Sequence, residues 1–147
     1  MSGFFNSLNV SASGLTAERL RMDIISRNIA NVNTTRTASG SPYRRQIPIF
    51  QELKSTQFSQ VFDRVSGQLT SRDGVEVASI TEDQTPFKRE YNPSHPDSDK
   101  DGYVLLPNVE VVSEMINLIS ANRAYDANVT VMNGTKSMAL KAMEIGR

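Results

Sequence analysis

The last forty residues carry an apolar stripe with the spacing of one long α-helix. From Val111 to Met143, stripe positions recur every third or fourth residue, and eight of these ten positions are apolar. Pro107 suits the first turn of such a helix, because the backbone N–H groups of that turn have no partner within the helix. A helix over residues 108–145 would be about 57 Å long at about 1.5 Å per residue. A compact domain of 147 residues cannot bury a stripe of that length, so we expect it to pair with another long helix.

A second stripe with the same spacing lies near the N-terminus. It runs from Phe5 to Ile29 with six of eight positions apolar, and it predicts a helix from about residue 4 to 32. We therefore expect a mainly α fold in which long N- and C-terminal helices pair as a coiled coil. The expected pairing residues are Leu8, Leu15, Met22, Ile29, Val111, Met115, Leu118, Asn122, Tyr125, Val129, Met132 and Met143. Asn122 and Lys136 are polar members of the second stripe, and buried polar groups fix the register and partner number of a coiled coil.

The middle of the chain has a different pattern. Residues 74–83 alternate and are rich in β-branched side chains, and residues 86–91 and 102–107 read as two further strands, so we expect a small antiparallel β element. Residues 52–72 show no clear stripe and receive no assignment. The chain thus divides into an N-terminal helical region (1–35), a loop or extended region (36–73), a small β-hairpin region (74–106) and a C-terminal helical region (107–147).

Charge and composition narrow the functional classes. Lys plus Arg equals Asp plus Glu at 16 each, which gives no electrostatic reason to expect a nucleic-acid partner. The charge is uneven: residues 1–50 hold six basic and two acidic side chains, and residues 51–106 hold six and ten. Cysteine is absent, so thiol chemistry and cysteine-bound zinc are excluded. We expect no secretory signal and no membrane anchor, because the N-terminus has no continuous apolar run.

No local motif indicates catalysis or a cofactor. Residues 97–102, DSDKDG, match the front of a calcium-binding loop, but the twelfth position is Asn108 where a bidentate Glu is required, so an acidic turn is the better reading. His95 is the only histidine and lies in a loop between two prolines. Tyr43, Arg44 and Arg45 could contact nucleic acid, but no second basic cluster accompanies them, which favours a protein contact or solvent. We expect no catalytic residue, no metal, no cofactor and no small-molecule substrate.

Two functional classes remain open on physical grounds. One is a polymerising structural protein whose terminal helices pair, and the other is a soluble coiled-coil adaptor or export chaperone. The polar stripe residues favour the first, because a repeating lattice requires a fixed register.

Two motifs at opposite ends of the chain resemble the bacterial flagellar axial proteins, the rod, hook and filament-joining family. The first follows the pattern N-[IL]-A-N-x-x-[ST] at the end of an N-terminal helix, and the second follows A-x-R-x-Y-x-A-N in a C-terminal helix. Here they comprise Asn28, Ile29, Ala30, Asn31 and Thr34, and Ala121, Arg123, Tyr125, Ala127 and Asn128. Within the family, the short middle region and the sequence before the last helix resemble the C-type proximal rod subunits of the basal body, with the B-type proximal rod protein as the nearest alternative.

The resemblance implies a structural role. Members of this family form a drive shaft that carries torque from the membrane ring of the basal body to the hook, and their paired terminal helices surround an export channel. The expected partners are other copies of the chain, other rod proteins, membrane-ring and rod-junction proteins, and the flagellar type III export apparatus. The segment after the first helix would contact neighbouring subunits, with Asn28, Ala30, Asn31, Thr34, Tyr43, Arg44, Arg45, Arg123 and Asn128 as the motif and contact residues.

Overall fold

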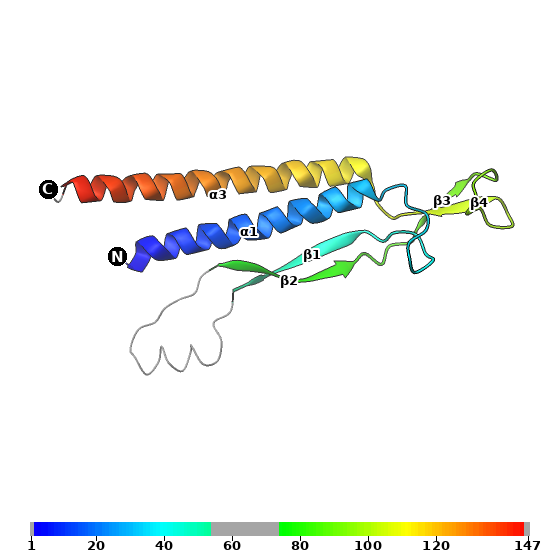
Figure 1. Cartoon of the computed structure of the whole chain (residues 1–147), viewed down its shortest axis with the longest axis horizontal. Helices are drawn as coiled ribbons and strands as arrows, with labels where there is room; N and C mark the ends of the chain where they lie inside the picture. Colours follow the sequence, from blue (N-terminus) through cyan, green and yellow to red (C-terminus); the bar gives the residue numbers. More distant parts are fainter. Residues whose placement is uncertain (1, 54–73, 146–147) are drawn as a thin grey trace, which may run out of the picture. The chain divides into compact units, whose positions relative to one another are not determined.

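The computed structural model describes residues 2–53 and 74–145. Within these residues lie two long helices, α1 (Ser2–Ala30) and α3 (Val111–Ile145), and four strands between them (Figure 1). The strands are β1 (Gln46–Glu52), β2 (Val75–Glu82), β3 (Lys88–Tyr91) and β4 (Tyr103–Leu106). The expected mainly α fold with an antiparallel β middle is therefore confirmed. Among the described residues, no helix is both long and apolar enough to span a membrane.

The β region differs in detail from the sequence expectation. The strands form two separate two-stranded sheets, β1–β2 and β3–β4. Strand β1 falls within residues 36–73, where we expected a loop or extended region. Pro48 lies inside β1 and cannot donate to a sheet ladder, which hides the strand in the sequence, but a two-stranded sheet leaves each strand with one free edge for such a residue. Residues 54–72, most of the unassigned stretch 52–72, lie outside the described residues.

Helix α3 begins later than the sequence suggested. Its first residue is Val111 rather than 108, and the N–H of Glu114 donates to the Glu110 carbonyl at 2.9 Å as the helix opens. Pro107 is buried just before it, and the Asn108 side chain is bonded to the segment around residues 83–85. These contacts hold residues 107–109 out of the helix.

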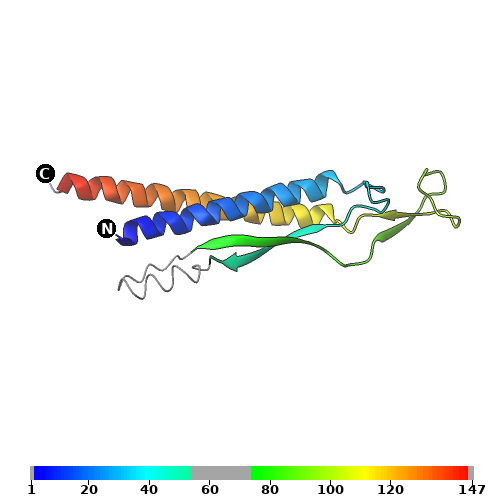
Figure 2. The same ribbon diagram turned by 60° about the horizontal axis from the view of Figure 1, so that its bottom comes forward.

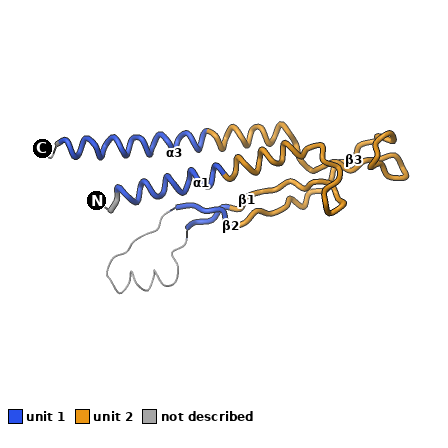
Figure 3. The backbone as a smooth tube through the Cα atoms, in the orientation of Figure 1, with its two compact units in different colours: residues 1–19, 50–78, 123–147 blue, residues 20–49, 79–122 orange. Residues whose placement is uncertain are grey.

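The chain separates into two compact units (Figure 3). Unit 1 contains residues 1–19, 50–78 and 123–147, and unit 2 contains residues 20–49 and 79–122. Each unit therefore contains part of both terminal helices and part of the β1–β2 hairpin. We describe the two units separately.

In unit 1, the first part of α1 runs antiparallel to the last part of α3 (Figures 1 and 2). Gly14 marks a close approach, because a Cβ added there would lie 3.0 Å from the Asn128 side-chain nitrogen. Ser13 joins the helix to the sheet: its hydroxyl accepts a hydrogen bond from the Val75 N–H at 3.1 Å and donates to the Val10 carbonyl at 2.7 Å. Small side chains on α1 thus set the packing of unit 1.

In unit 2, a compact apolar core accompanies the last part of α1 and the first part of α3. Its buried apolar residues are Ile24, Ile25, Val104, Val109 and Ala121. The β3–β4 hairpin is antiparallel, with Lys88 opposite Leu106 and Tyr91 opposite Tyr103. The two tyrosine rings meet edge to face with centroids 5.3 Å apart.

Candidate functional site

A polar cluster in unit 2, which we name the helix-end network, joins the end of α1 to the start of α3 and to the β1–β2 hairpin. Its members are Asn28, Tyr43, Arg45, Gln46, Asp83, Asn108 and Glu114. They come from four separate stretches of the sequence: residue 28, residues 43–46, residue 83 and residues 108–114. Because buried polar groups are costly unless paired, a cluster of this kind specifies one arrangement of its segments.

Asn28 lies at the centre of the helix-end network and is 1% exposed. Its Oδ1 accepts hydrogen bonds from the Tyr43 hydroxyl at 2.9 Å and from the Gln46 N–H at 3.0 Å. Its Nδ2 donates to Glu114 Oε2 at 3.0 Å and to the Gln46 carbonyl at 2.9 Å. Two donors and two lone pairs are the full capacity of an asparagine amide, so every one is used. These four contacts therefore need the two donors and two lone pairs of an amide at position 28.

Glu114 supplies a buried carboxylate in the first turn of α3. Its Oε1 accepts from Arg45 Nε at 2.8 Å and lies 2.7 Å from Arg45 Nη2, while its Oε2 accepts from Asn28. The partial positive charge at a helix N-terminus also favours a carboxylate there. A buried charge with this many partners is held in one position, because losing any partner would leave charge desolvated.

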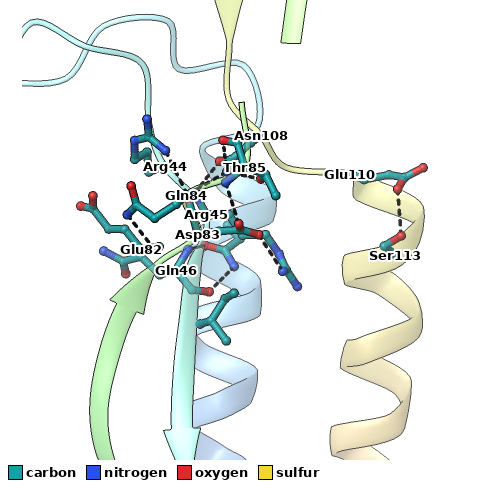
Figure 4. A network of polar contacts seen from close by, with 12 residues as sticks. Arg44, Arg45, Gln46, Glu82, Asp83, Gln84, Thr85, Asn108, Glu110 and Ser113 are labelled. Atoms are coloured by element: carbon teal, nitrogen blue, oxygen red, sulfur yellow. Dashed lines mark hydrogen bonds and ion pairs between the residues drawn. The ribbon is translucent and has the colours of Figure 1, made fainter. Parts of the chain in front are cut away.

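Arg45 continues the helix-end network to the β1–β2 hairpin (Figure 4). Its Nη1 donates to Asp83 Oδ2 at 3.3 Å, and its backbone N–H donates to Asn108 Oδ1 at 2.9 Å. The Asn108 amide in turn donates to the Asp83 carbonyl at 3.1 Å and to the Thr85 hydroxyl at 2.8 Å. The Asn108 side chain therefore holds the residue just before β1 and the residues just after β2 at one amide group.

The surroundings of Arg45, Asp83 and Tyr43 in the helix-end network shift the pKa values of these three side chains. Burial alone would lower the pKa of Arg45, but its hydrogen bonds and charge attraction with Glu114 and Asp83 raise that pKa above the ordinary value. The pKa of Asp83 is lowered, chiefly because its carboxylate accepts a hydrogen bond from the Thr85 N–H and also because Arg45 lies close by. Burial raises the pKa of the Tyr43 hydroxyl, against the opposing effect of Arg27. The helix-end network therefore favours charged Arg45 and Asp83 with a neutral Tyr43.

The residues expected to reach neighbouring subunits have partners within their own chain. Tyr43 and Arg45 belong to the helix-end network. Arg44 donates to the Asp83 carbonyl at 3.0 Å, and its guanidinium lies 4.4 Å from the centroid of the Phe87 ring. Arg45 finds two acidic side chains, Asp83 and Glu114, in its own chain, and contact of these three residues with a neighbouring subunit stays a prediction.

The other motif residues lie at the ends and faces of the helices. Asn31 donates to the Arg27 carbonyl at 2.9 Å and accepts from the Thr34 hydroxyl at 3.1 Å, which closes the end of α1. Ala30 and Arg123 are exposed. Asn128 folds back onto its own helix, donating to the Ala124 carbonyl at 3.1 Å, at the position where Gly14 packs against it.

The expected pairing residues lie at the edges of the buried helix faces or outside them. Half-buried positions are Leu8, Leu15, Met22, Ile29, Leu118, Tyr125, Val129 and Met132. Exposed positions are Val111, Met115, Asn122 and Met143. The buried helix positions that they flank are instead mostly small or polar: Ser11, Gly14, Ala17, Ile24, Ile25, Asn28, Glu114, Ala121 and Thr135. Small residues allow helices to approach closely, which leaves larger neighbours at the edges. A role for the expected residues between subunits stays a prediction.

Sequence reasoning missed Glu114, Asn108, Asp83 and Gln46. Glu114 could have been found from its spacing, because residues 114, 121, 128 and 135 recur every seven positions and are Glu, Ala, Asn and Thr. A row of small and polar residues with this spacing, beside an apolar stripe, is compatible with the face along which two closely packed helices touch. No local pattern marks the other three.

The first carboxylate of the acidic turn, that of Asp97, is held in protein contacts. Asp97 accepts from the Thr35 hydroxyl at 2.8 Å and lies 3.8 Å from Arg36. Gly102 has φ of 76°, a value that glycine adopts easily, at the turn. Across residues 2–53 and 74–145, no group of three or more His, Asp or Glu side chains is arranged to hold a metal ion.

Comparison with known proteins identifies the family. A model described as flagella basal body rod protein matches residues 8–36, and one described as flagellar basal body rod FlgEFG protein C-terminal matches residues 100–145. The flagellar basal-body rod protein FlgC of Borreliella burgdorferi is 50% identical over 97% of both chains. The FlgC proteins of Bacillus subtilis and Salmonella typhimurium are 47% and 39% identical, each over 97% of this chain, and over 98% and 97% of their own. At this identity and coverage, the chain belongs to the FlgC family of flagellar basal-body rod proteins.

Proposed function

We propose that the chain is a structural subunit of the proximal rod, which transmits torque from the membrane ring to the hook and encloses the export channel. The subunit assembles with other copies of itself, with other rod proteins and with membrane-ring and rod-junction proteins. The subunit is exported through the flagellar type III export apparatus. As part of the assembled rod, it crosses the cell envelope. It performs no catalysis and binds no cofactor.

The observation that carries this proposal is an exposed apolar face on the first part of α3. Val112, Met115, Ile116 and Ile119 occupy positions i, i+3, i+4 and i+7 of one helix face and are each more than half exposed. A contiguous exposed apolar face of this kind is typical of a surface that is covered in an assembly. A tube forms when such contacts join unlike surfaces and do not close into a ring.

The helix-end network suits a subunit under mechanical load. It ties α1, α3 and the β1–β2 hairpin together through buried and charge-assisted hydrogen bonds, which are about twice as strong as neutral ones. A torque passing through the rod must be carried across such joints between segments. The network therefore keeps the subunit's own helices and hairpin in register while its outer surfaces contact neighbours.

Electron microscopy of basal bodies tests the proposal. A strain that lacks this chain should have no rod and no hook, and a plasmid copy should restore both. The variant Ile116→Asp should fail to restore them while the protein is still made, because it places a carboxylate on the exposed apolar face without touching the core of the subunit. Asn133→Asp, at an exposed polar site on the same helix, should restore assembly. A complete rod and hook in the deletion strain would overturn the proposed function.

A further inference from the structure

Gly134 lies in the interior of α3, and none of the residues that the structure describes gives a packing reason for a glycine there. It is exposed, and a Cβ added there would meet no described residue within 4 Å. Glycine is the least favourable residue after proline in a helix interior, because it loses the most backbone entropy on ordering. Gly14 shows the opposite case, since the missing side chain there makes room for Asn128. The space above Gly134 is therefore available to a group from outside the chain.

The surface around Gly134 is apolar. Val131 precedes it by three residues and Met138 follows it by four, so both lie on the same side of α3. Val131 is 51% exposed and Met138 is 66% exposed. A gap between two exposed apolar side chains accepts a similar apolar side chain from another helix.

Charged residues bracket this surface in a repeated arrangement. Arg123 is followed three residues later by Asp126, and Lys141 is followed three residues later by Glu144. All four side chains are exposed, and the two pairs lie eighteen residues apart, which is five helical turns. Each end of the surface thus carries a cation and, three residues further along, an anion.

We infer that the α3 helix of a second copy of this chain packs in parallel along this surface, displaced by three residues. This inference rests on the proposed function, in which copies of the chain are neighbours in the rod. A displacement of three residues is about 4.5 Å along the helix. It places Arg123 beside Asp126 of the second copy and Lys141 beside Glu144 of the second copy. The same displacement places Val131 over the gap at Gly134 of the second copy.

The exposed charges favour the displaced parallel pair over a parallel pair without displacement. In an undisplaced parallel pair, Arg123 and Lys141 would each lie level with their own counterparts, and like charges at one level are destabilising. The displaced pair also joins two different strips of the same helix. A contact of that kind repeats from copy to copy without closing, as a tube requires.

Cross-linking of two cysteine variants tests the displacement directly, because the natural chain has no cysteine. One strain expresses two versions of the chain, Met138→Cys and Lys141→Cys, and its isolated basal bodies are treated with a short bismaleimide. We expect a product of twice the 16.3 kDa chain mass, formed by joining position 138 of one copy to position 141 of the next. Strains that express Met138→Cys alone or Lys141→Cys alone are the controls, because joining two identical versions gives a product of the same mass. The mixed strain should give more of this product than either control. A yield no higher than that of the controls, or no product at all, would overturn the inference.

A bulky residue at Gly134 provides an independent test. Gly134→Leu should abolish rod assembly and motility while leaving the amount and helix content of the purified subunit unchanged, because none of the described residues occupies the space. Lys136→Leu places a leucine at an exposed position on the opposite side of α3 and should retain motility. If Gly134→Leu cells swim normally while the deletion strain lacks a rod, the inference fails and the proposed function stands. If the deletion strain builds a rod, the proposed function itself fails.

Discussion

Asn28 and Glu114 lie 86 residues apart in the sequence and share a buried hydrogen bond of 3.0 Å. The bond joins the last turn of α1 to the first turn of α3, so it fixes the register of the two helices in unit 2. Both side chains are 1% exposed, and each has further partners that use its remaining capacity. The helix-end network is therefore the point at which a change of one atom is expected to have the largest effect on the subunit.

Removing the Glu114 carboxylate should destabilise the subunit strongly. Glu114→Ala leaves Arg45 and Asn28 without their shared acceptor, and breaking a buried ion pair from one side costs about 3 to 5 kcal/mol. We expect the lower end, about 3 kcal/mol, because Arg45 is 27% exposed and can recover some hydration. Urea unfolding of the purified chain, followed by circular dichroism, measures the change.

Glu110→Ala is the matched control for this experiment. Glu110 lies one turn before Glu114, is exposed, and accepts a hydrogen bond from the Ser113 hydroxyl at 3.0 Å. Its loss should change the free energy of unfolding by about 0.5 kcal/mol or less, as is usual for exposed sites. Equal effects of the two substitutions would show that the network contributes nothing beyond ordinary surface contacts.

A charge at position 28 should be more damaging than the loss of one hydrogen bond. Asn28→Asp replaces the donor at 3.0 Å from Glu114 with a second carboxylate, and it also loses the bond to the Gln46 carbonyl. Two carboxylates at this distance in a buried site repel each other, and Glu114 Oε2 loses the donor that Asn28 supplied. We expect a loss of about 3 kcal/mol or more by the same urea measurement at neutral pH.

The companion variant Asn33→Asp separates this effect from the added charge alone. Asn33 is exposed and follows the end of α1 by only three residues. It should unfold at nearly the same urea concentration as the natural chain. A loss of stability as large as that of Asn28→Asp would place the cause in the net charge of the helix end, and not in the contact with Glu114.

The terminal helices and strands β2, β3 and β4 could be predicted from the sequence because their patterns are local. Apolar spacing of three and four residues identified α1 and α3, and alternation identified β2. The contact face of the helices could not be placed in the same way. Positions such as Gly14, Asn28 and Glu114 are buried, whereas the larger apolar residues beside them stay half or fully exposed. The apolar stripe therefore showed where each helix lies in the sequence. It did not show which face of the helix makes contacts within the single chain.

The helix-end network was beyond prediction for a different reason. The partners of Arg45 are Glu114 and Asp83, which lie 69 and 38 residues away, and no periodic pattern relates them. The pattern around Arg45 showed only that a basic pair follows the first helix. Whether its acidic partner lies in the same chain or in a neighbour depends on the tertiary fold.

The ionisation of Asp83 predicts a loss of stability in acid. Its pKa is lowered in the folded chain, so the folded state binds the proton less readily than the unfolded state. The resulting stability is fully present above about pH 4, the ordinary pKa of aspartate, and is lost as the pH falls through the lowered folded value. Comparing the natural chain with Asp83→Asn by thermal unfolding should show a difference at pH 7 that shrinks below about pH 4.

Two observations would contradict this account of Asp83. One is a constant difference between the two proteins from pH 7 down to the acid limit, which would mean that the carboxylate charge has no part in the effect. The other is a difference that grows as the pH falls, because protonating Asp83 in the natural chain should make the two side chains more alike.

The close approach at Gly14 predicts a steric effect in unit 1. Gly14→Leu introduces a Cβ at 3.0 Å from the Asn128 side-chain nitrogen, and the rest of the leucine must displace the two helix segments or the Asn128 side chain. Overpacking of this kind usually costs about 1 to 3 kcal/mol. The gain in helix propensity on replacing glycine, about 1 kcal/mol at most, opposes it and does not remove it. We therefore expect a net loss of about 1 to 2 kcal/mol, measured by urea unfolding.

Ala12→Leu is the control, because position 12 lies on the same helix and is exposed. It adds a comparable side chain where no contact is in the way, so its stability should stay close to that of the natural chain. Gly14→Leu combined with Asn128→Ala completes the test, because shortening the side chain at position 128 removes the atoms that the new Cβ would meet. The double variant should be more stable than the sum of the two single losses of stability predicts, because the effects of substitutions at residues in contact are not independent. If the losses of stability simply add, the residues at positions 14 and 128 do not restrict each other's packing. The distance between the two helix segments of unit 1 would then be set by other residues.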